Sequence, residues 1–330
     1  MIGTRTLLSR CFIACIAPAF AAPLHAAQSD ALSLYPNKSI RFIVPFAPGA
    51  GTDTTGRTLA QKLGEKWGQQ VVVDNRTGAA GAIGVEYTMN ANPDGYTICL
   101  ISATHSTDAA TNPKLPYDLT KDLQAVSQVT SLFYVVYHHP SVPVKSIKEL
   151  VAYARANPGK LNYGSSGTGG LQHFAGELFN HMAGTKMVHV PYRGAGAAIP
   201  AMLANEIQLG FATLFGVRPQ VQAGRLRWLA ITSGKRSPVV DLPTVAESGL
   251  PGYEVDQWYG VITSAKVPRP IVAKLHGAIA DALKSPDVAQ RLASDGSTPV
   301  ASTPEQFGAH IKSEIGKWRK LVKDANLTLH

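Results

Sequence analysis

The chain has 330 residues, of which 45% are hydrophobic and 16% are charged, and its formal net charge is +9. This composition is too apolar and too weakly charged for a disordered protein, which could not bury enough surface to offset its chain entropy. The length allows one large domain or two domains with a substantial core. The Gly and Pro residues show no period, which excludes collagen-like, low-complexity and solenoid architectures.

The segment 1–27 has the pattern of a secretory signal peptide. A basic start precedes a short apolar stretch, and small residues follow it. A membrane anchor would need about 20 predominantly apolar residues, whereas two prolines and a histidine interrupt this segment. We therefore expect an exported protein, with cleavage after Ala21, Ala26 or Ala27.

Cysteine content and charge distribution limit the chemistry of the mature chain. Cys99 is the one cysteine outside the predicted signal peptide, so the mature chain can form no internal disulfide. Because Cys99 lies in an apolar run, we predict a small buried hydrophobic residue rather than a nucleophile. The basic residues are scattered and form no block of five or six, which argues against nucleic-acid binding. A positive net charge favours an anionic solute over a cationic one.

Strands and helices are expected to alternate along the mature chain. Apolar runs predict strands, and apolar residues spaced four apart predict helices. Such alternation predicts parallel sheets, because the crossover between parallel strands needs about the length of a helix. The predicted strands are 40–46, 71–73, 96–102, 126–129, 133–137, 161–164, 188–190, 209–213, 228–232 and 255–263. The predicted helices follow the loops at 47–53, 74–81 and 191–194, span 171–182 and 270–284, and start at the capping boxes Ser146/Glu149 and Thr303/Gln306.

Four loops rich in small residues join a predicted strand to the next predicted helix. A helix N-terminus presents unpaired N–H groups and about half a positive charge, and glycine lets an anion approach the backbone. Open α/β sheets bind ligands at the carboxyl ends of their strands. Each loop alone fits an ordinary turn, with Thr52, Asp53 or Ser166 as a helix N-cap, but four in one chain favour anion binding. The loops span 49–53, 78–84, 165–170 and 194–196.

Motifs for cofactor binding and catalysis are incomplete. The loop from Gly49 lacks the third Gly of G-x-G-x-x-G, and the chain contains neither G-K-S nor G-K-T. The segment Gly164–Thr168 lacks the last Gly of the G-x-S-x-G nucleophile motif. No histidines show the H-x-x-x-H spacing of a zinc site. Two interpretations of His173 stay open: it donates a hydrogen bond to a ligand, or it is hydrogen-bonded to its own loop. We expect a protein that is not an enzyme and holds no cofactor or metal.

Short motifs distributed over the mature chain carry a family resemblance. They are Tyr35–Asp53, Val73–Arg76 with Gly78 and Gly81, Pro93–Thr97, Lys114–Asp118, Leu161–Tyr163, His173 with Gly176–Phe179, His189–Gly194, Leu242–Val245 and Trp258–Gly260. In combination they resemble the Bug-type periplasmic solute receptors of tripartite tricarboxylate transporters. The resemblance covers essentially the whole mature chain.

The resemblance implies a type II periplasmic binding fold of the α/β class. Two α/β lobes with mainly parallel sheets are then joined by hinge strands and close over one small carboxylated solute. The lobe boundaries that follow are 28–128 plus 255–330 for lobe 1 and 129–254 for lobe 2.

The resemblance also implies a set of ligand-binding positions. In the family, the turn corresponding to 49–53 cradles a ligand carboxylate through backbone N–H groups and ordered water, and the loop corresponding to 165–170 holds the other end. Phe46, Tyr192 and Phe215 are candidates to pack on the ligand body, with core packing the stronger alternative for Phe215. The candidate ligand-binding residues are Phe46, Gly49, Ala50, Gly51, Thr52, Asp53, Ser102, Thr104, Ser165, Ser166, Gly167, Thr168, Gly169, His173, Tyr192 and Thr213.

Two departures from the family pattern bear on the ligand. Ala212 stands where many relatives have Asp or Asn, and Ser102–His105 replaces a run of Ser before His. The alanine removes an acceptor for an ammonium or hydroxyl group, so we expect a ligand without an amino group.

The expected protein is a monomeric periplasmic receptor that captures a small carboxylate, aliphatic or aromatic, for the permease subunits of a tripartite tricarboxylate-type transporter. Two alternatives stay open. One is a receptor that signals to a membrane sensor kinase, and the other is an enzyme of the same fold acting on an anionic substrate. The incomplete nucleophile, metal and cofactor motifs count against the enzyme.

Overall fold

The computed structural model describes residues 34–49, 51–192, 195–294 and 296–327. The predicted signal peptide 1–27 and the candidate site residue Ala50 lie outside the described residues. From Pro36 onward the chain forms one compact unit. In the described ranges, no helix has both the length and the apolar character needed to cross a membrane.

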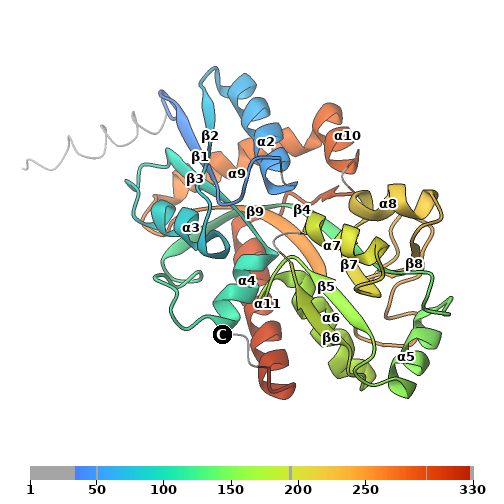
Figure 1. Ribbon diagram of the computed structural model, residues 1–330. Coiled ribbons are helices and arrows are strands. Elements are labelled where there is room, and N and C mark those ends of the chain that lie inside the picture. The colour runs from blue at the N-terminus through green and yellow to red at the C-terminus, as the bar shows by residue number, and fades with distance from the viewer. Residues whose placement is uncertain (1–33, 50, 193–194, 295, 328–330) are drawn as a thin grey trace, which may run out of the picture. The chain divides into compact units, whose positions relative to one another are not determined.

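The described strands form one continuous mixed sheet in the order β2-β1-β3-β9-β4-β7-β5-β6, and β8 and β10 pair with β4 off this path (Figure 1). The strands are β1 (Ile40–Val44), β2 (Val71–Asn75), β3 (Thr97–Ser102), β4 (Leu123–His138), β5 (Asn162–Ser165), β6 (Val188–Pro191), β7 (Leu209–Thr213), β8 (Arg227–Ile231), β9 (Asp256–Ser264) and β10 (Thr298–Pro299).

Among the described strands, two sets pair in parallel. Strands β2, β1 and β3 are parallel to one another and form the first strand group. Strands β7, β5 and β6 are parallel to one another and form the second strand group. The antiparallel strands β9 and β4 join the two groups. The predicted parallel sheets are therefore present within each group, and the connection between the groups is antiparallel.

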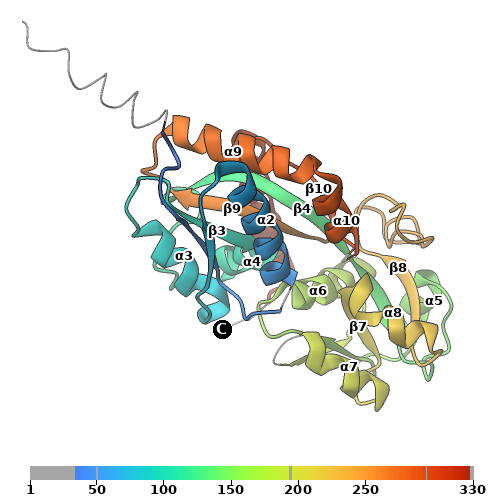
Figure 2. The same cartoon turned by 90° about the horizontal axis from the view of Figure 1, so that it is seen from above.

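Helices follow most of these strands. They are α2 (Gly51–Trp67), the short 3-10 helix η1 (Ala79–Gly81), α3 (Ala82–Met89), α4 (Ala103–Thr111), α5 (Ile147–Ala156), α6 (Leu171–Ala183), α7 (Ala195–Leu203), α8 (Leu214–Gln222), α9 (Arg269–Lys284), α10 (Pro286–Ser294) and α11 (Pro304–Asp324). Helices α2, α9 and α10 pack against one another (Figure 2). Helices α4, α8 and α10 were not predicted, because α4 and α8 begin directly after a strand and α10 follows α9 after one residue.

The long strand β4 corrects the prediction of two strands at 126–129 and 133–137. The polar residues between them, Thr130 and Ser131, continue the strand and pair with β9. Two register shifts against β9, between Ala125 and Ser127 and between Gln128 and Thr130, interrupt the regular apolar alternation that sequence reasoning depends on.

One predicted capping box is complete and the other is altered. In α11, the Gln306 N–H donates to Thr303 Oγ1 at 3.2 Å and the Thr303 N–H donates to Gln306 Oε1 at 3.0 Å. In α5, Ser146 Oγ accepts from the Glu149 N–H, but Glu149 Oε2 accepts from the N–H of Lys145 instead of Ser146. Both helices start where predicted.

Helices cover both faces of the first strand group. A methyl group at Gly56 of α2 would come within 2.8 Å of Val44 Cγ2, and one at Gly84 of α3 would come within 3.1 Å of Ile43 Cγ2. Neighbouring residues of β1 thus point to opposite helices, as the two-residue period of a strand requires. Cys99 is fully buried in this core, and burial raises the pKa of its thiol to about 12, which confirms it as an inert core residue.

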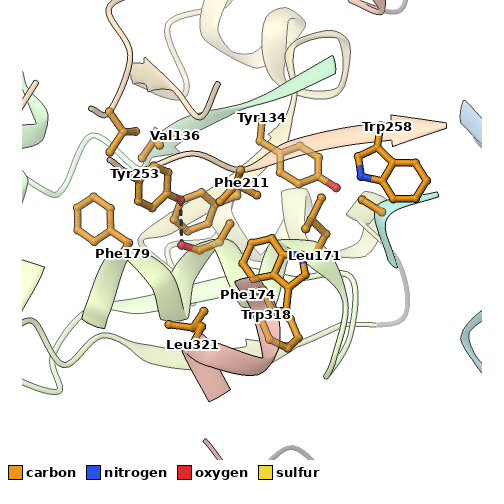
Figure 3. Close-up of a cluster of buried hydrophobic side chains, with 14 of the residues drawn as sticks. Tyr134, Val136, Leu171, Phe174, Phe179, Phe211, Tyr253, Trp258, Trp318 and Leu321 are labelled. Carbon is orange, nitrogen blue, oxygen red and sulfur yellow. Dashed lines mark hydrogen bonds between the residues drawn. The ribbon is translucent and has the colours of Figure 1, made fainter. Parts of the chain in front are cut away.

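A second part of the core connects elements of both strand groups (Figure 3). The Trp318 ring of α11 meets the Phe174 ring of α6 edge to face, with centroids 5.3 Å apart. The Tyr253 hydroxyl donates to the backbone oxygen of Ala175 at 2.9 Å. The C-terminal helix is therefore anchored beside the helix that follows β5.

We predict that Trp318→Ala lowers the free energy of unfolding by about 3 to 5 kcal/mol, because it leaves a large cavity between α11 and α6. Chemical denaturation measures the loss. Ser313→Ala, at an exposed position of the same helix, is the control and should change stability by less than about 0.5 kcal/mol. Equal stability of the two variants would contradict the anchoring role of Trp318.

Candidate functional site

The carboxyl ends of the two strand groups face each other along β4. Ser102, the last residue of β3, pairs with Tyr259, which pairs with Thr130 of β4. Thr213, the last residue of β7, pairs with Tyr134 of β4. Strand β3 runs parallel to β4, and β7 runs antiparallel to it, so β3 and β7 end toward each other. Their last residues lie level with Thr130 and Tyr134 of β4, which are four residues, or about 13 Å, apart. The loops that follow the strands therefore open toward a common space.

A direct hydrogen bond joins the two sides. The Thr107 hydroxyl of α4 shares its hydrogen between the carbonyl of Thr104, at 2.8 Å, and the carbonyl of Gly169, at 2.9 Å. Helix α4 follows β3, and Gly169 follows β5, so this bond connects the first strand group to the loop at 165–170. Sequence reasoning missed Thr107 because α4 was not predicted.

The turn before α2 is held from inside by Asp53. Its carboxylate, 2% exposed, accepts hydrogen bonds from the Gly49 N–H, from Arg57 Nε and from Asn75 Nδ2, each at 2.9 Å. Asn75 Nδ2 also donates to the backbone oxygen of Phe46. Burial opposes ionisation of Asp53, but the three hydrogen bonds outweigh it and lower the pKa of the carboxyl. Asp53 therefore shapes the turn that presents the start of α2.

The alternative assignment of helix N-caps is wrong at all three positions. Helix α2 begins at Gly51, which places Thr52 and Asp53 in its first turn. The N-cap of α6 is Gly170, and Ser166 lies exposed in the preceding loop. Gly51 is itself exposed and lies next to Tyr259, whose hydroxyl would be 2.7 Å from a methyl group at that position.

The loop at 165–170 is bonded to the first turn of α6. The Ser166 N–H donates to Gln172 Oε1 at 2.8 Å, and the Gly169 N–H donates to His173 Nδ1 at 3.2 Å. Of the two interpretations of His173, the structure shows the bond to its own loop. Ser166 and Thr168 have exposed side chains, so the hydroxyl groups of this loop are available at the surface.

His105 connects three segments at the end of β3. Its Nδ1 accepts from the Ser102 N–H at 3.1 Å, and its ring meets the Phe46 ring edge to face with centroids 5.5 Å apart. Gly81, at a φ of 99°, lies so close that a methyl group there would be 2.6 Å from His105 Nε2. Burial lowers the pKa of His105 to about 4, which keeps the ring neutral at neutral pH. Thr104, half-buried, lies in the same first turn of α4.

On the second strand group, Tyr192 and Thr213 are half-buried. Tyr192 directly follows β6, and Thr213 is the last residue of β7. The Tyr192 N–H donates to the Ser165 carbonyl at 3.1 Å, which places it beside the 165–170 loop. Phe215 is 62% exposed, which overturns the preference for core packing. The reason is local, because α8 starts at Leu214, whose side chain is buried, and the next residue then points outward.

Two other features lie outside this arrangement. A cavity of about 950 Å³ between the start of β4, α9 and α11 is lined by none of the candidate residues. In the described part of the chain, no three His, Cys, Asp or Glu side chains come together in a way that could hold a metal ion.

Residues 55–327 match the model of the tripartite tricarboxylate transporter family receptor. The chain belongs to this receptor family. It is 34% identical over 300 residues to protein BugT of Bordetella pertussis, an alignment that covers 89% of this chain and 91% of BugT. These findings confirm the resemblance to Bug-type receptors that the sequence motifs carried.

Solved structures of similar proteins confirm the α/β binding-protein fold. Rpa4515 of R. palustris, solved with adipate, is 33% identical with a TM-score of 0.79, and the match covers 88% of this receptor and 98% of that chain. MatC of Rhodopseudomonas palustris, solved with bound malate, is 29% identical with a TM-score of 0.76, covering 87% of this receptor and 100% of that chain.

We predict that the receptor loses stability as the pH falls from 7 toward 4. Burial lowers the pKa of His105 to about 4, whereas the unfolded chain takes up this proton near pH 6.5. Between these values the unfolded state binds the extra proton, so stability falls with decreasing pH by up to about 1.4 kcal/mol per pH unit for this residue. Denaturation curves at pH 7 and pH 5 measure the change.

In that experiment His105→Gln should reduce the difference between the two pH values, because the variant lacks the buried titrating group. His181→Gln, at an exposed position of α6, is the matched control and should keep the wild-type difference. The same pH dependence in wild type and His105→Gln would show that His105 does not contribute.

Proposed function

We propose that this receptor captures a small carboxylate in the periplasm and delivers it to the permease of a tripartite tricarboxylate transporter. The observation that supports the proposal most is the opposition of two helix-start segments. The turn before α2 and the loop before α6 belong to different strand groups, and the carboxyl ends of those groups face each other along β4. The bond from Thr107 to Gly169 shows that the two sides meet.

Backbone N–H groups at these helix starts supply the affinity in this proposal. The first N–H groups of a helix have no partner within it and attract anions. A micromolar Kd corresponds to about 8 kcal/mol, and charge-assisted hydrogen bonds contribute about 1.5 to 3 kcal/mol each. Several such bonds, from the first N–H groups of α2 and from the exposed Ser166 and Thr168 hydroxyls of the 165–170 loop, can supply this after the costs of closure. No catalytic group is required.

Closure would move the two lobes about the strands that join them. We propose lobe 1 as 28–128 plus 255–330 and lobe 2 as 129–254. The chain then passes from lobe 1 to lobe 2 within β4 and returns to lobe 1 just before β9. Hinge motion of this kind absorbs its change in a few residues of the connecting strands. Bringing both loops onto one ligand would also create the surface that a permease recognises.

The expected ligand is a dicarboxylate without an amino group. The similar structures hold adipate and malate, which are both dicarboxylates. In this chain Ala212 is buried at the end of β7 and offers no acceptor for an ammonium group, and the exposed Phe215 adds an apolar ring nearby. These features favour a ligand with a carboxylate at each end and an apolar body.

A thermal-shift screen tests the ligand class. We expect adipate, malate or a related acid to raise the Tm by several degrees, because a ligand present at 100 times its Kd stabilises the native state by about 2.7 kcal/mol. Aspartate should raise the Tm less than malate, since its ammonium group finds no acceptor at Ala212. A Tm that rises only with cations or neutral sugars would refute carboxylate binding.

Substitution of Ser166 tests the loop. Ser166→Tyr places a bulky side chain at an exposed position of the 165–170 loop, so we expect normal folding and an affinity at least about tenfold weaker, or about 1.4 kcal/mol. Calorimetric titration with the acid that gives the largest thermal shift measures it. Ser313→Tyr on α11 is the matched control, and wild-type affinity in Ser166→Tyr would remove this loop from the site.

The genes beside this one separate uptake from signalling. Permease genes would support delivery to a transporter, whereas a sensor kinase gene without permease genes would favour a signalling receptor.

A further inference from the structure

Two histidines stack on each other behind the 165–170 loop. His173 lies in the first turn of α6 and His189 in β6, with ring centroids 3.7 Å apart and ring planes at 12°. The ring of Tyr163, on the neighbouring strand β5, lies 5.1 Å from that of His189. His189 lies in one of the motifs that carry the family resemblance of the sequence, but the site described above gives it no role.

His189 contacts the start of the loop. Its Nε2 lies 2.6 Å from Ser165 Oγ. The same hydroxyl donates to the Gly167 carbonyl at 3.0 Å and accepts from the Gly167 N–H at 3.1 Å. A serine hydroxyl has one hydrogen and two acceptor positions. With the hydroxyl hydrogen on the Gly167 carbonyl, the His189 imidazole donates from Nε2, and this assignment satisfies all three contacts of the hydroxyl with a neutral ring.

His173 contacts the end of the loop. Its Nδ1 accepts from the Gly169 N–H, so its proton lies on Nε2, which is 3.9 Å from Glu177 Oε1. The Tyr163 hydroxyl donates to the same Glu177 oxygen at 2.6 Å. A second proton on His173 would have to occupy Nδ1 and would break the bond to Gly169. The arrangement therefore needs a neutral ring.

The surroundings keep both rings neutral. Burial lowers the pKa of His173 to about 3, with the neighbouring His189 adding to the effect, and burial lowers the pKa of His189 to about 4. Burial also raises the pKa of Glu177, although the hydrogen bond from Tyr163 opposes this. At neutral pH the pair consists of two uncharged imidazoles.

We propose that His189 and His173 act together as positioning residues that hold the 165–170 loop in the shape that receives a carboxylate. His189 holds Ser165 and, through it, Gly167, and His173 holds Gly169. The two glycines have φ values of 138° and 78°, a backbone conformation that local interactions alone specify poorly. The stacked rings fix both contacts relative to each other. The binding part of this proposal rests on the proposed function, whereas the ordering of the loop does not.

The contact between Ser165 and His189 also has the distance of a nucleophile and its general base. Two observations assign it to loop positioning. The Ser165 residue is 1% exposed, and its hydroxyl is held on both sides by Gly167. A nucleophile needs access to its substrate and a hydrogen that the base can remove.

Substitution of His189 tests the proposal in the ligand-free protein. His189→Leu keeps the bulk and removes the donor, whereas His189→Gln places an amide N–H near the position of Nε2. The measurement is amide hydrogen exchange of residues 165–170 at pH 7. We expect exchange at Gly167 to be at least about tenfold faster in His189→Leu and to return to within about threefold of wild type in His189→Gln.

Matching variants of His173 extend the test. His173→Asn keeps an acceptor near the position of Nδ1 and should preserve protection of the Gly169 amide, whereas His173→Leu should lose it. His181→Leu, at an exposed position of α6, is the control and should leave exchange in the loop unchanged. If His189→Leu does not fold, His189→Asn replaces it, because its shorter amide cannot reach Ser165.

Affinities for adipate and malate complete the experiment. Weaker binding in His189→Leu with recovery in His189→Gln supports the proposal. Equal exchange rates at Gly167 in His189→Leu and His189→Gln would overturn it. A loss of protection that is uniform over the whole fold would also overturn it. Fast loop exchange with unchanged affinity would overturn the binding part. If neither acid nor any other carboxylate binds the wild type while the exchange pattern holds, the proposed function fails and the positioning of the loop stands.

Discussion

The pairing of β4 with β7 on one side and, through β9, with β3 on the other is the constraint on which the candidate site depends. Its first part pairs with β9 and its last part with β7 and β8. Because a strand pairs in a fixed register, the level at which β3 ends and the level at which β7 ends are both set by β4. The distance between the two sets of loops is therefore a property of the sheet and does not depend on the conformation of any loop.

The loops themselves are shaped by polar side chains that are turned inward. Asp53 holds the turn before α2, His105 joins the end of β3 to Gly81, and Gln172 and His173 hold the loop before α6. Such groups satisfy buried donors and acceptors and fix the backbone. In this arrangement the polar side chains hold the loops in shape, and the loop backbone that they support would contact the solute.

Much of the fold could be predicted from the sequence. Strand β7 was predicted at its observed bounds, the Thr303 capping box marks the start of α11, and Cys99 is buried. The failures share a physical origin. Register shifts in β4 break the two-residue period, and helices that start directly after a strand, such as α4 and α8, have no turn residues to announce them.

The candidate site shows the same limit. Glycine-rich loops after strands are visible in a sequence, and two of the predicted ones precede α2 and α6, although the last three residues of the first, Gly51–Asp53, already belong to α2. Contacts between distant segments are not visible. The bond from Thr107 to Gly169 joins residues 62 apart, and the outward turn of Phe215 follows from where α8 begins. Both need the tertiary structure.

The enclosure of Cys99 gives the molecule a property that a sequence count of cysteines does not convey. Its sulfur is sealed between β1, β3 and the helices that cover them, and it resists deprotonation. Alkylating dyes and oxidants would meet this sulfur only when the sheet opens. The rate at which Cys99 is modified therefore measures how often the core opens.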